Sequence, residues 1–105
     1  MGYYFVYLMT NKYNKTIYCG ITNNLIRRCI EHTIGINKKS YTFKYNISRL
    51  VYYEVFLDPK SAIGREKQIK NYSRNSKILL IEKVNSEWVN LFDEDSRGIA
   101  TLRSQ

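Results

Sequence analysis

The 105-residue sequence contains no apolar run long enough to cross a lipid bilayer as a helix. Its N-terminus also lacks the basic and then apolar pattern, and the small-residue cleavage site, of a signal peptide. These absences predict a soluble, cytoplasmic protein with no membrane partner. A chain of this length is expected to form one domain with a single core.

Cysteine and glycine motifs are also scarce. Cys19 and Cys29 are the only cysteines, and neither has partners at the spacing of a zinc site, so both are predicted to be reduced thiols in the core, with no disulfide. The sequence has no internal repeat, no Walker or dinucleotide-binding glycine pattern, and no paired acidic residues at metal-cluster spacing. The nucleotide-binding folds built on those glycine motifs are therefore excluded.

Acidic side chains are few in the first part of the chain. Residues 1–85 hold 15 basic and 5 acidic side chains, a net charge of +10, whereas residues 86–105 carry a net charge of −2. Such a basic excess favours a polyanionic partner, and nucleic acid is the commonest polyanion in a cell. The ten tyrosines add to this interpretation, because phenol rings stack on bases. A merely solubilising basic surface is the alternative that charge alone leaves open.

Residues 3–22 have the pattern of a β-hairpin. Apolar and aromatic side chains dominate the segments Tyr3–Met9 and Thr16–Thr22, and a polar loop separates them. Because side chains alternate between the two faces of a strand, the aliphatic residues of both segments share one face. This face is predicted to be core: Val6, Leu8, Ile17, Cys19 and Ile21.

The opposite face of the hairpin carries aromatic side chains and a glycine. If the loop is centred on residues 12–13, Tyr7 lies opposite Tyr18. The same register places Phe5 opposite Gly20. A face with two phenols and a glycine is a poor core, but it suits the floor of a functional site. A shift of one residue in the register would separate the two phenols.

A helix is predicted to follow the hairpin over residues 25–32, with Asn23 as its N-cap. Its buried stripe is expected to consist of Leu25, Ile26, Cys29 and Ile30. At about 100° per residue, Arg28 and His32 border this stripe and can lean over the hairpin. Two residues of the outer face are expected to form an exposed ion pair: Arg27 and Glu31.

The remaining chain is predicted to add a third strand and further helices. The strand, Ile47–Phe56, completes a three-stranded sheet with the hairpin. A helix begins with Asp58 as its N-cap and Pro59 in its first turn, and runs to about Asn71. The next helix, 76–84, is capped by Ser73 or Asn75 and has an apolar side formed by Ile78, Leu79, Ile81 and Val84.

Residues 86–92 are predicted to form a short helix that closes the core with Trp88 and Phe92. The predicted fold is therefore α/β in the α+β sense, with a three-stranded antiparallel sheet flanked by three main helices. A single domain is expected to span residues 1–92, and residues 93–105 are expected to form a polar, flexible tail.

Glu66 is the most informative residue of the helix that starts at Pro59. On a helical wheel it lies on the packing side, together with Ala62, Ile63, Ile69 and Lys70. A carboxylate on a packing face is costly unless something positive meets it. From the residues alone, an ion pair with Lys70 or another basic residue is favoured over a metal ligand or a charge placed in a cleft.

Taken together, these candidate residues resemble the pattern of the GIY-YIG nuclease family. Phe5-Val6-Tyr7 stands where the family has its first tripeptide, and Tyr18-Cys19-Gly20 stands where it has the second. The helix pattern of the family matches Leu25, Arg28 and His32, and its helix-borne glutamate matches Glu66. The chain is most similar to small stand-alone bacterial single-domain members, which are related to the N-terminal nuclease module of the excision-repair incision subunit.

The chain departs from the family pattern in a few places. Phe5 replaces a glycine and Cys19 replaces an aliphatic residue, and neither exchange removes a chemical group that the family uses. The family's late asparagine has three candidates here: Asn71, Asn75 and Asn85.

The resemblance implies a divalent-metal-dependent endonuclease that hydrolyses phosphodiester bonds, in repair or nucleic-acid processing. DNA is favoured over RNA as the substrate, and the sequence leaves that choice open. Tyr7, acidified by neighbouring cations, would take the proton of the attacking water, and Arg28 would hold the phosphate oxygens. Glu66 would anchor one Mg²⁺ or Mn²⁺ ion. Tyr18 would orient the water or the phosphate, and His32 would bind phosphate or assist proton transfer.

Four lysines are expected to contact the nucleic acid: Lys38, Lys39, Lys44 and Lys70. The alternative function is a catalytically weak or inactive nucleic-acid-binding module with the same fold. A protein-interaction domain with an incidental basic face is the third interpretation. The sequence identifies no protein partner.

Overall fold

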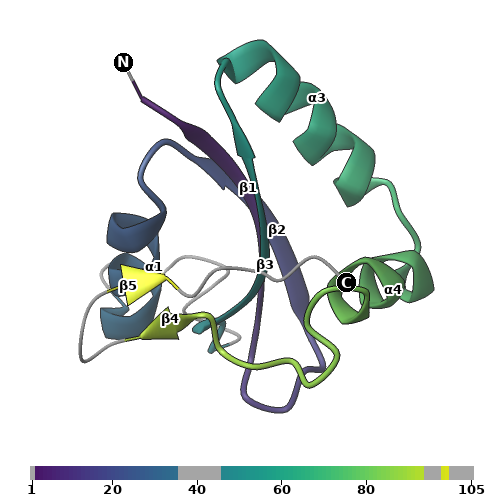
Figure 1. The fold of residues 1–105 in the computed structure, drawn as a ribbon. Coiled ribbons are helices and arrows are strands. Elements are labelled where there is room, and N and C mark those ends of the chain that lie inside the picture. The colour runs from purple at the N-terminus through teal and green to yellow at the C-terminus, as the bar shows by residue number, and fades with distance from the viewer. Residues whose placement is uncertain (1, 36–45, 94–97, 100–105) are drawn as a thin grey trace.

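The computed structural model describes residues 2–35, 46–93 and 98–99. Its elements in chain order are β1 (Tyr4–Thr10), β2 (Ile17–Thr22), α1 (Leu25–Ile34), β3 (Arg49–Phe56), α3 (Pro59–Lys70), α4 (Arg74–Glu82), β4 (Phe92–Asp93) and β5 (Gly98–Ile99) (Figure 1). The main sheet is antiparallel with the strand order β2-β1-β3, so the predicted α+β fold with three main helices is confirmed. Within the described residues, no helix has the length and apolar character needed to cross a membrane.

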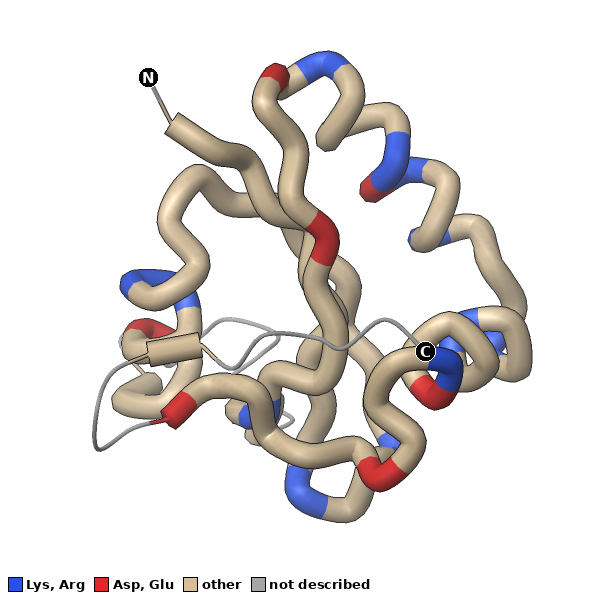
Figure 2. Tube along the Cα trace, in the orientation of Figure 1, with Lys and Arg blue, Asp and Glu red and all other residues tan. Residues whose placement is uncertain are grey.

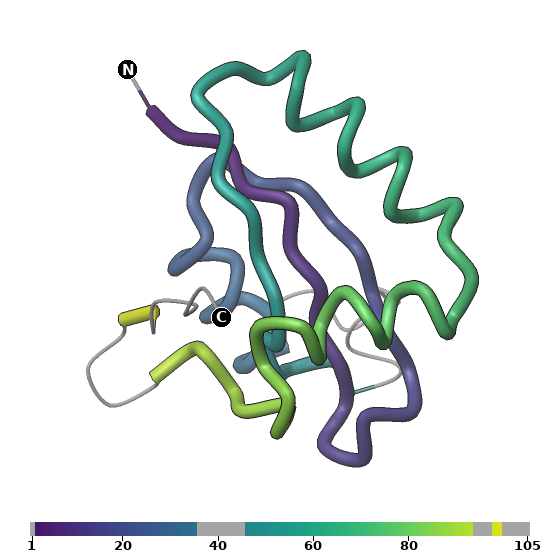
Figure 3. The backbone as a smooth tube through the Cα atoms, turned by 45° about the vertical axis from the view of Figure 1, so that its right-hand side comes forward, coloured from purple at the N-terminus to yellow at the C-terminus, as the bar shows by residue number. Residues whose placement is uncertain are grey.

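Helices cover both faces of the sheet, as Figure 3 shows, with α3 and α4 on one side and α1 on the other. The face under α3 and α4 carries the predicted aliphatic core, including Val6, Leu8 and Cys19. The face under α1 holds a second hydrophobic cluster that includes Tyr7 and Cys29. The aromatic face of the hairpin is therefore itself buried, which the sequence interpretation did not anticipate. Both cysteines are buried free thiols.

The register of the hairpin differs from the predicted one. Tyr7 lies opposite Gly20, and Tyr18 lies opposite Met9. The turn explains the shift, because the main-chain N–H of Asn14 donates to the carbonyl of Asn11 at 3.0 Å and Asn14 adopts a left-handed φ of 56°. The centre of the loop therefore moves toward the second strand. The shift amounts to two residues in the pairing, so it leaves both phenols on one face.

Helix α1 begins at Leu25 as predicted, but its N-cap lies one residue later than predicted. Asn24, and not Asn23, is the N-cap, and its side chain accepts a hydrogen bond from the N–H of Arg27 at 3.0 Å. Ile26, predicted to be buried, is 41% exposed. The buried positions of the helix follow a spacing of four and then three residues: Leu25, Cys29 and His32.

The starts of α3 and α4 follow the predicted capping chemistry. Asp58 caps α3 by accepting from the N–H of Ser61 at 2.8 Å, with Pro59 in the first turn. Ser73 caps α4. Two residues predicted on apolar sides are instead exposed, Ile63 at 45% and Leu79 at 69%. Each helix contributes a narrower buried stripe than its sequence indicated.

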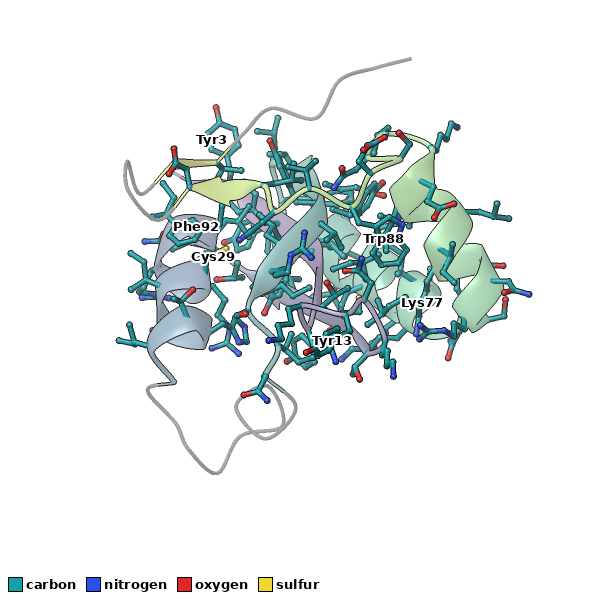
Figure 4. All side chains as sticks on the ribbon, turned by 90° about the horizontal axis from the view of Figure 1, so that it is seen from below. Tyr3, Tyr13, Cys29, Lys77, Trp88 and Phe92 are labelled. Carbon is teal, nitrogen blue, oxygen red and sulfur yellow. The ribbon has the colours of Figure 1, made fainter. Side chains whose placement is uncertain are left out.

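The predicted short helix over 86–92 is wrong. The segment is irregular because side chains take its backbone hydrogen bonds: the Asn85 amide binds the N–H and the carbonyl of Val89, and Arg49 binds the carbonyl of Trp88. Trp88 itself adopts a φ of 55°, which a helix excludes. The expected closure of the core is nevertheless present, since Trp88 and Phe92 are buried on opposite sides of the sheet (Figure 4).

Part of the region expected to be a tail is ordered as a strand. Gly98–Ile99 pairs antiparallel with Phe92–Asp93, and Ile99 packs against the cluster under α1.

Candidate active site

A hydrogen bond between helix α1 and the central strand organises the candidate site. Nε of Arg28 donates to the Tyr7 hydroxyl at 3.1 Å. The other end of the guanidinium is also held, because its Nη1 lies 3.2 Å from Oε1 of Glu31. The bond with Tyr7 raises the pKa of Arg28 more than partial burial lowers it. Arg28 is thus a fixed and permanently charged group beside the phenol.

Three rings surround this hydrogen bond. The centroid of Tyr7 lies 6.2 Å from that of Tyr18 and 6.2 Å from that of His32, and the Tyr18 and His32 centroids are 5.9 Å apart. A hydrogen bond with Tyr18 further raises the pKa of Arg28. The structure therefore brings four of the five predicted site residues together. We call Tyr7, Tyr18, Arg28 and His32 the Tyr7 cluster.

Tyr7 is 1% exposed, and this burial changes the pKa of its phenol. Removal from water raises the pKa of Tyr7 to about 12, although the hydrogen bond and the charge of Arg28 act to lower it. At neutral pH the hydroxyl therefore accepts a hydrogen bond from Arg28 and keeps its own proton. The expected acidifying effect of Arg28 is present, but burial outweighs it.

His32 is a buried and neutral imidazole. Its side chain is 8% exposed, and its Nε2 has no hydrogen-bond partner in the part of the chain that the structure describes. Burial, followed by the charge of Arg28, lowers the pKa of His32 to about 4. A buried polar atom without a partner is uncommon in a folded protein and is a ready position for an incoming hydrogen-bonding group.

Acidification is expected to destabilise the protein through His32. The unfolded chain takes up a proton near pH 6.5, whereas the folded protein does so only near pH 4, so the unfolded state binds more protons between these values. The contribution is complete above pH 6.5 and falls by about 2 kcal/mol between pH 7.5 and pH 5. Urea unfolding at several pH values measures it.

The matched variant for this experiment is His32→Phe, which keeps a ring in the cluster and cannot titrate. Its free energy of unfolding should change far less between pH 7.5 and pH 5, and an equal slope in both proteins would contradict the assignment. This is the single histidine of the sequence, so no second imidazole contributes.

Gly20 makes room for Tyr7 across the hairpin. A Cβ atom at position 20 would lie 2.4 Å from the Tyr7 hydroxyl oxygen, which no real contact allows. Because the Tyr7 ring is almost fully buried and bound to Arg28, it cannot move aside without leaving the cluster. The glycine of the second tripeptide is therefore a steric requirement of the phenol opposite.

Gly20→Ala is expected to destabilise the fold by about 1–3 kcal/mol, as overpacking of a filled core does. The control is Gly64→Ala in helix α3, where a new Cβ meets nothing within 4 Å. That substitution should stabilise the protein by about 0.5–1 kcal/mol, because alanine favours a helix over glycine. Urea denaturation compares the two, and similar effects in both would contradict the steric argument.

Glu66 lies on α3 and forms the ion pair that the residues alone suggested. Its Oε2 is 2.8 Å from Nζ of Lys70, and its side chain is 14% exposed whereas that of Lys70 is 54% exposed. The hydrogen bond with Glu66 raises the pKa of Lys70. The carboxylate is thus shielded, and an ammonium occupies one of its oxygens.

The two parts of the predicted site flank strand β2 from opposite sides. Tyr18 belongs to the cluster under α1, whereas the Sγ of Cys19 lies 3.9 Å from the main-chain oxygen of Glu66. The charge of Lys70 also interacts with both Tyr18 and Cys19. Because β2 is an edge strand of the main sheet, groups on its two faces can meet past its open edge. The structure does not place Glu66 inside the Tyr7 cluster.

The residue before Glu66 fixes α3 against the sheet. Nε and Nη2 of Arg65 donate to the carboxylate of Glu54 on β3 at 2.9 and 2.8 Å. The same carboxylate accepts from the hydroxyl of Tyr52, and Arg65 also donates to the hydroxyl of Tyr72 at 3.2 Å. This bidentate pair limits rotation of α3 and so sets the direction of Glu66.

The donor set suits a single hard cation held by one carboxylate. Among residues 2–35, 46–93 and 98–99, no three His, Cys, Asp or Glu side chains gather as a metal cluster. Mg²⁺ does not need such a cluster, because it is commonly held by one or two carboxylates together with water and phosphate oxygens. Glu66, whose oxygen already accepts a positive group, fits that pattern.

Glu31 is a site residue that the sequence interpretation missed. It pairs with Arg27 at 3.8 Å, as predicted, but it lies closer to Arg28, at 3.2 Å. The signal was its three-residue spacing from Arg28, which places the two on neighbouring turns. Of the lysines expected to contact nucleic acid, Lys70 pairs with Glu66, and the others lie outside the described residues: Lys38, Lys39 and Lys44.

The three candidates for a late asparagine differ in what their side chains do. The Asn85 amide is 7% exposed and binds the main chain of Val51 and Val89. Asn71 is the C-cap of α3, and Asn75 is exposed in the first turn of α4. Asn85 therefore holds the loop after α4 in place.

Comparisons with known proteins identify the family to which the chain belongs. The GIY-YIG catalytic domain family matches residues 3–78, so the chain belongs to this family, which is a family of nucleases. Its relatives include the UPF0213 protein of Clostridium perfringens, which is 39% identical over 77 residues and aligns over 73% of this chain and 81% of the relative. The UPF0213 protein of Staphylococcus haemolyticus is 36% identical over 83 residues, covering 79% of this chain and 99% of the relative.

A solved structure supports the same placement. The solution NMR structure of a UPF0213 protein from Bacillus halodurans matches with a TM-score of 0.54 and 27% identity, over 84% of this chain and 92% of that one. The expected likeness to small single-domain members of the family is confirmed.

Proposed function

We propose that the protein is a divalent-metal-dependent endonuclease that hydrolyses phosphodiester bonds in DNA. The observation that carries the proposal is the convergence of Arg28, Tyr7 and Tyr18 beside the unpaired Nε2 of His32. A fixed guanidinium next to hydroxyl groups suits a phosphate, since its donors bind two oxygens at once. The basic charge of the chain adds long-range attraction for a nucleic acid, and Figure 2 shows Lys and Arg distributed over α1, α3 and α4.

Each member of the cluster then has a defined role. Arg28 binds the non-bridging oxygens of the phosphate and neutralises the charge that develops on them. Tyr7 and Tyr18 orient the attacking water through their hydroxyls, and Tyr7, after losing its own proton to solvent, takes the proton of that water as a phenolate. Since the pKa of Tyr7 is about 12 in the free protein, this transfer requires more positive charge near the phenol than Arg28 provides. His32, neutral at physiological pH, accepts a hydrogen bond at Nε2.

Glu66 is the residue we assign to the metal ion. A bound Mg²⁺ or Mn²⁺ supplies positive charge that neutralises the phosphate and acidifies neighbouring hydroxyls. Lys70 pairs with this carboxylate, and a cation held by Glu66 would take its place. As an exposed ammonium beside the edge of β2, Lys70 is then free to contact a phosphate.

A nucleic-acid-binding module without efficient turnover is the second candidate. It is favoured by the buried, protonated Tyr7 and by the closed ion pair of Glu66 with Lys70. In that case the Tyr7 cluster binds a phosphate and does not complete the reaction.

Incubation of the purified protein with single-stranded, duplex and branched DNA separates the two candidates. We expect nicking with Mg²⁺ or Mn²⁺ that stops when EDTA is added and resumes when the metal is restored. Binding that weakens with salt, without nicking under any metal, supports the binding module instead. RNA substrates in the same assay decide between the two nucleic acids.

A further inference from the structure

An open apolar cavity lies next to the Tyr7 cluster, at the end of the sheet where β1 begins. Its volume is about 430 Å³, which falls within the range of small-molecule binding pockets. Three aromatic side chains line it, Tyr3, Phe5 and Tyr53, and the rest of its wall is mostly aliphatic. Asn23 and Asn24 also belong to its wall.

The cavity and the candidate active site are neighbours along both β1 and α1. Phe5 precedes Tyr7 by two residues on the same face of β1, a separation of about 6.6 Å along the strand. Leu25, on the opposite wall, precedes Arg28 by three residues of α1, a rise of about 4.5 Å. A group next to a phosphate held at Arg28 can therefore reach the cavity.

We propose that this cavity binds one unpaired nucleobase of the strand that is cut at the Tyr7 cluster. The inference rests on the proposed function, because the base is expected to be joined to the phosphate that Arg28 binds. It adds that the substrate has an unpaired nucleotide at the cleavage position, as in single-stranded or branched DNA.

The chemistry of the lining favours a base over an aliphatic ligand. Phe5 and Tyr53 form an edge-to-face pair with centroids 6.5 Å apart, and the ring of Tyr3 is 56% exposed beside them. Aromatic side chains of this kind are stacking platforms for bases. The side-chain oxygens of Asn23 and Asn24 already accept hydrogen bonds from Arg27, and their NH2 groups can donate to the edge of a base, which a hydrocarbon could not use.

The surrounding charge also favours a nucleotide. Arg27 and Arg28 follow Asn24 by three and four residues, and Nη2 of Arg27 donates to the amide oxygen of Asn23 at 3.5 Å. A positive charge therefore borders this part of the cavity wall. An apolar peptide or a second copy of this basic chain gains nothing from that charge, whereas a base joined to phosphates does.

The test measures binding without cleavage. Fluorescence anisotropy with a labelled single-stranded DNA of about eight nucleotides, in EDTA, is repeated with oligonucleotides that carry one abasic position each. Tyr3→Ala is the informative variant because its ring is largely exposed, and Tyr13→Ala is its control. Tyr13 is a 67% exposed tyrosine in the loop at the other end of β1, and Figure 4 shows the two side chains far apart in the molecule.

We expect Tyr3→Ala to raise the Kd about tenfold and Tyr13→Ala to change it less than about twofold. One abasic position should weaken binding by the wild-type protein by a similar factor and leave Tyr3→Ala unaffected. Equal losses in the two variants, or abasic effects that do not depend on position, would overturn the proposal. A wild-type dimer that Tyr3→Ala dissociates, with DNA binding unchanged, would also overturn it in favour of a second copy as occupant.

The outcome is independent of catalysis. A protein that cleaves DNA but shows no effect of Tyr3→Ala on binding refutes the base pocket alone. A protein that binds DNA through Tyr3 but does not cleave it with any metal refutes the endonuclease alone.

Discussion

Arg28→Lys is expected to lower the rate constant for DNA cleavage about 10²- to 10³-fold. Lysine keeps the positive charge but presents one compact ammonium in place of a planar fork. In the structure the guanidinium reaches the Tyr7 hydroxyl through Nε and Glu31 through Nη1, and no single ammonium can hold both and a phosphate. The loss therefore arises from geometry, and it should appear in kcat more than in DNA binding.

The neighbouring arginine provides the control. Arg27→Lys makes the same chemical change one residue away, at a side chain that is 60% exposed and pairs with Glu31 at 3.8 Å. We expect this variant to cleave DNA at close to the wild-type rate. Steady-state kinetics with excess metal measures both variants. If Arg27→Lys loses as much activity as Arg28→Lys, the role given to Arg28 fails and α1 contributes only general basic charge.

Glu66→Gln is expected to abolish metal-dependent cleavage, with a loss of about 10³-fold or more. The substitution keeps the volume of the side chain and removes the charge that a hard cation requires. Stability should change little, because an ion pair with a half-exposed lysine contributes only about 0.3–0.5 kcal/mol. The variant should therefore fold normally, bind DNA and leave it uncut.

Metal binding is the second measurement for this position. Titration calorimetry with Mn²⁺ should show one site in the wild-type protein with DNA present and none in Glu66→Gln. Glu87→Gln, an exposed carboxylate after α4, is the control and should leave both activity and titration unchanged. Activity that survives in Glu66→Gln would show that the carboxylate serves only its ion pair with Lys70.

The strands and helices that have a clear hydrophobic periodicity and a recognisable capping residue could be predicted from the sequence. The prediction of which hairpin residues share a face was correct, although the predicted pairing of the strands was not. A shift of two residues in the pairing preserves the alternation of side chains. The register depended on how the loop closes, and the left-handed Asn14 moved its centre. Asn24 rather than Asn23 became the cap for the same reason: backbone geometry chose between two adjacent asparagines.

The segment after α4 could not be predicted from its own residues. Its conformation depends on Arg49, from β3, which binds the carbonyl of Trp88, and on Asn85, whose amide replaces backbone partners that a helix would supply. The contact of Arg49 with Trp88 joins positions that are 39 residues apart in the chain. The state of Glu66 was open for a related reason, since its four-residue spacing from Lys70 suits an ion pair and its place on α3 suits a metal ligand.

The position of Tyr7 on β1 has a consequence for how the protein accommodates a substrate. Residues 6–10 of this strand are at most 1% exposed, and the strand is hydrogen-bonded along both of its edges. Its amide hydrogens should exchange with solvent only when the whole domain unfolds. The main chain that carries the Tyr7 phenol is therefore held in place. Any adjustment to a bent or frayed DNA strand must come from movement of α1, which carries Arg28, and of α3, which carries Glu66.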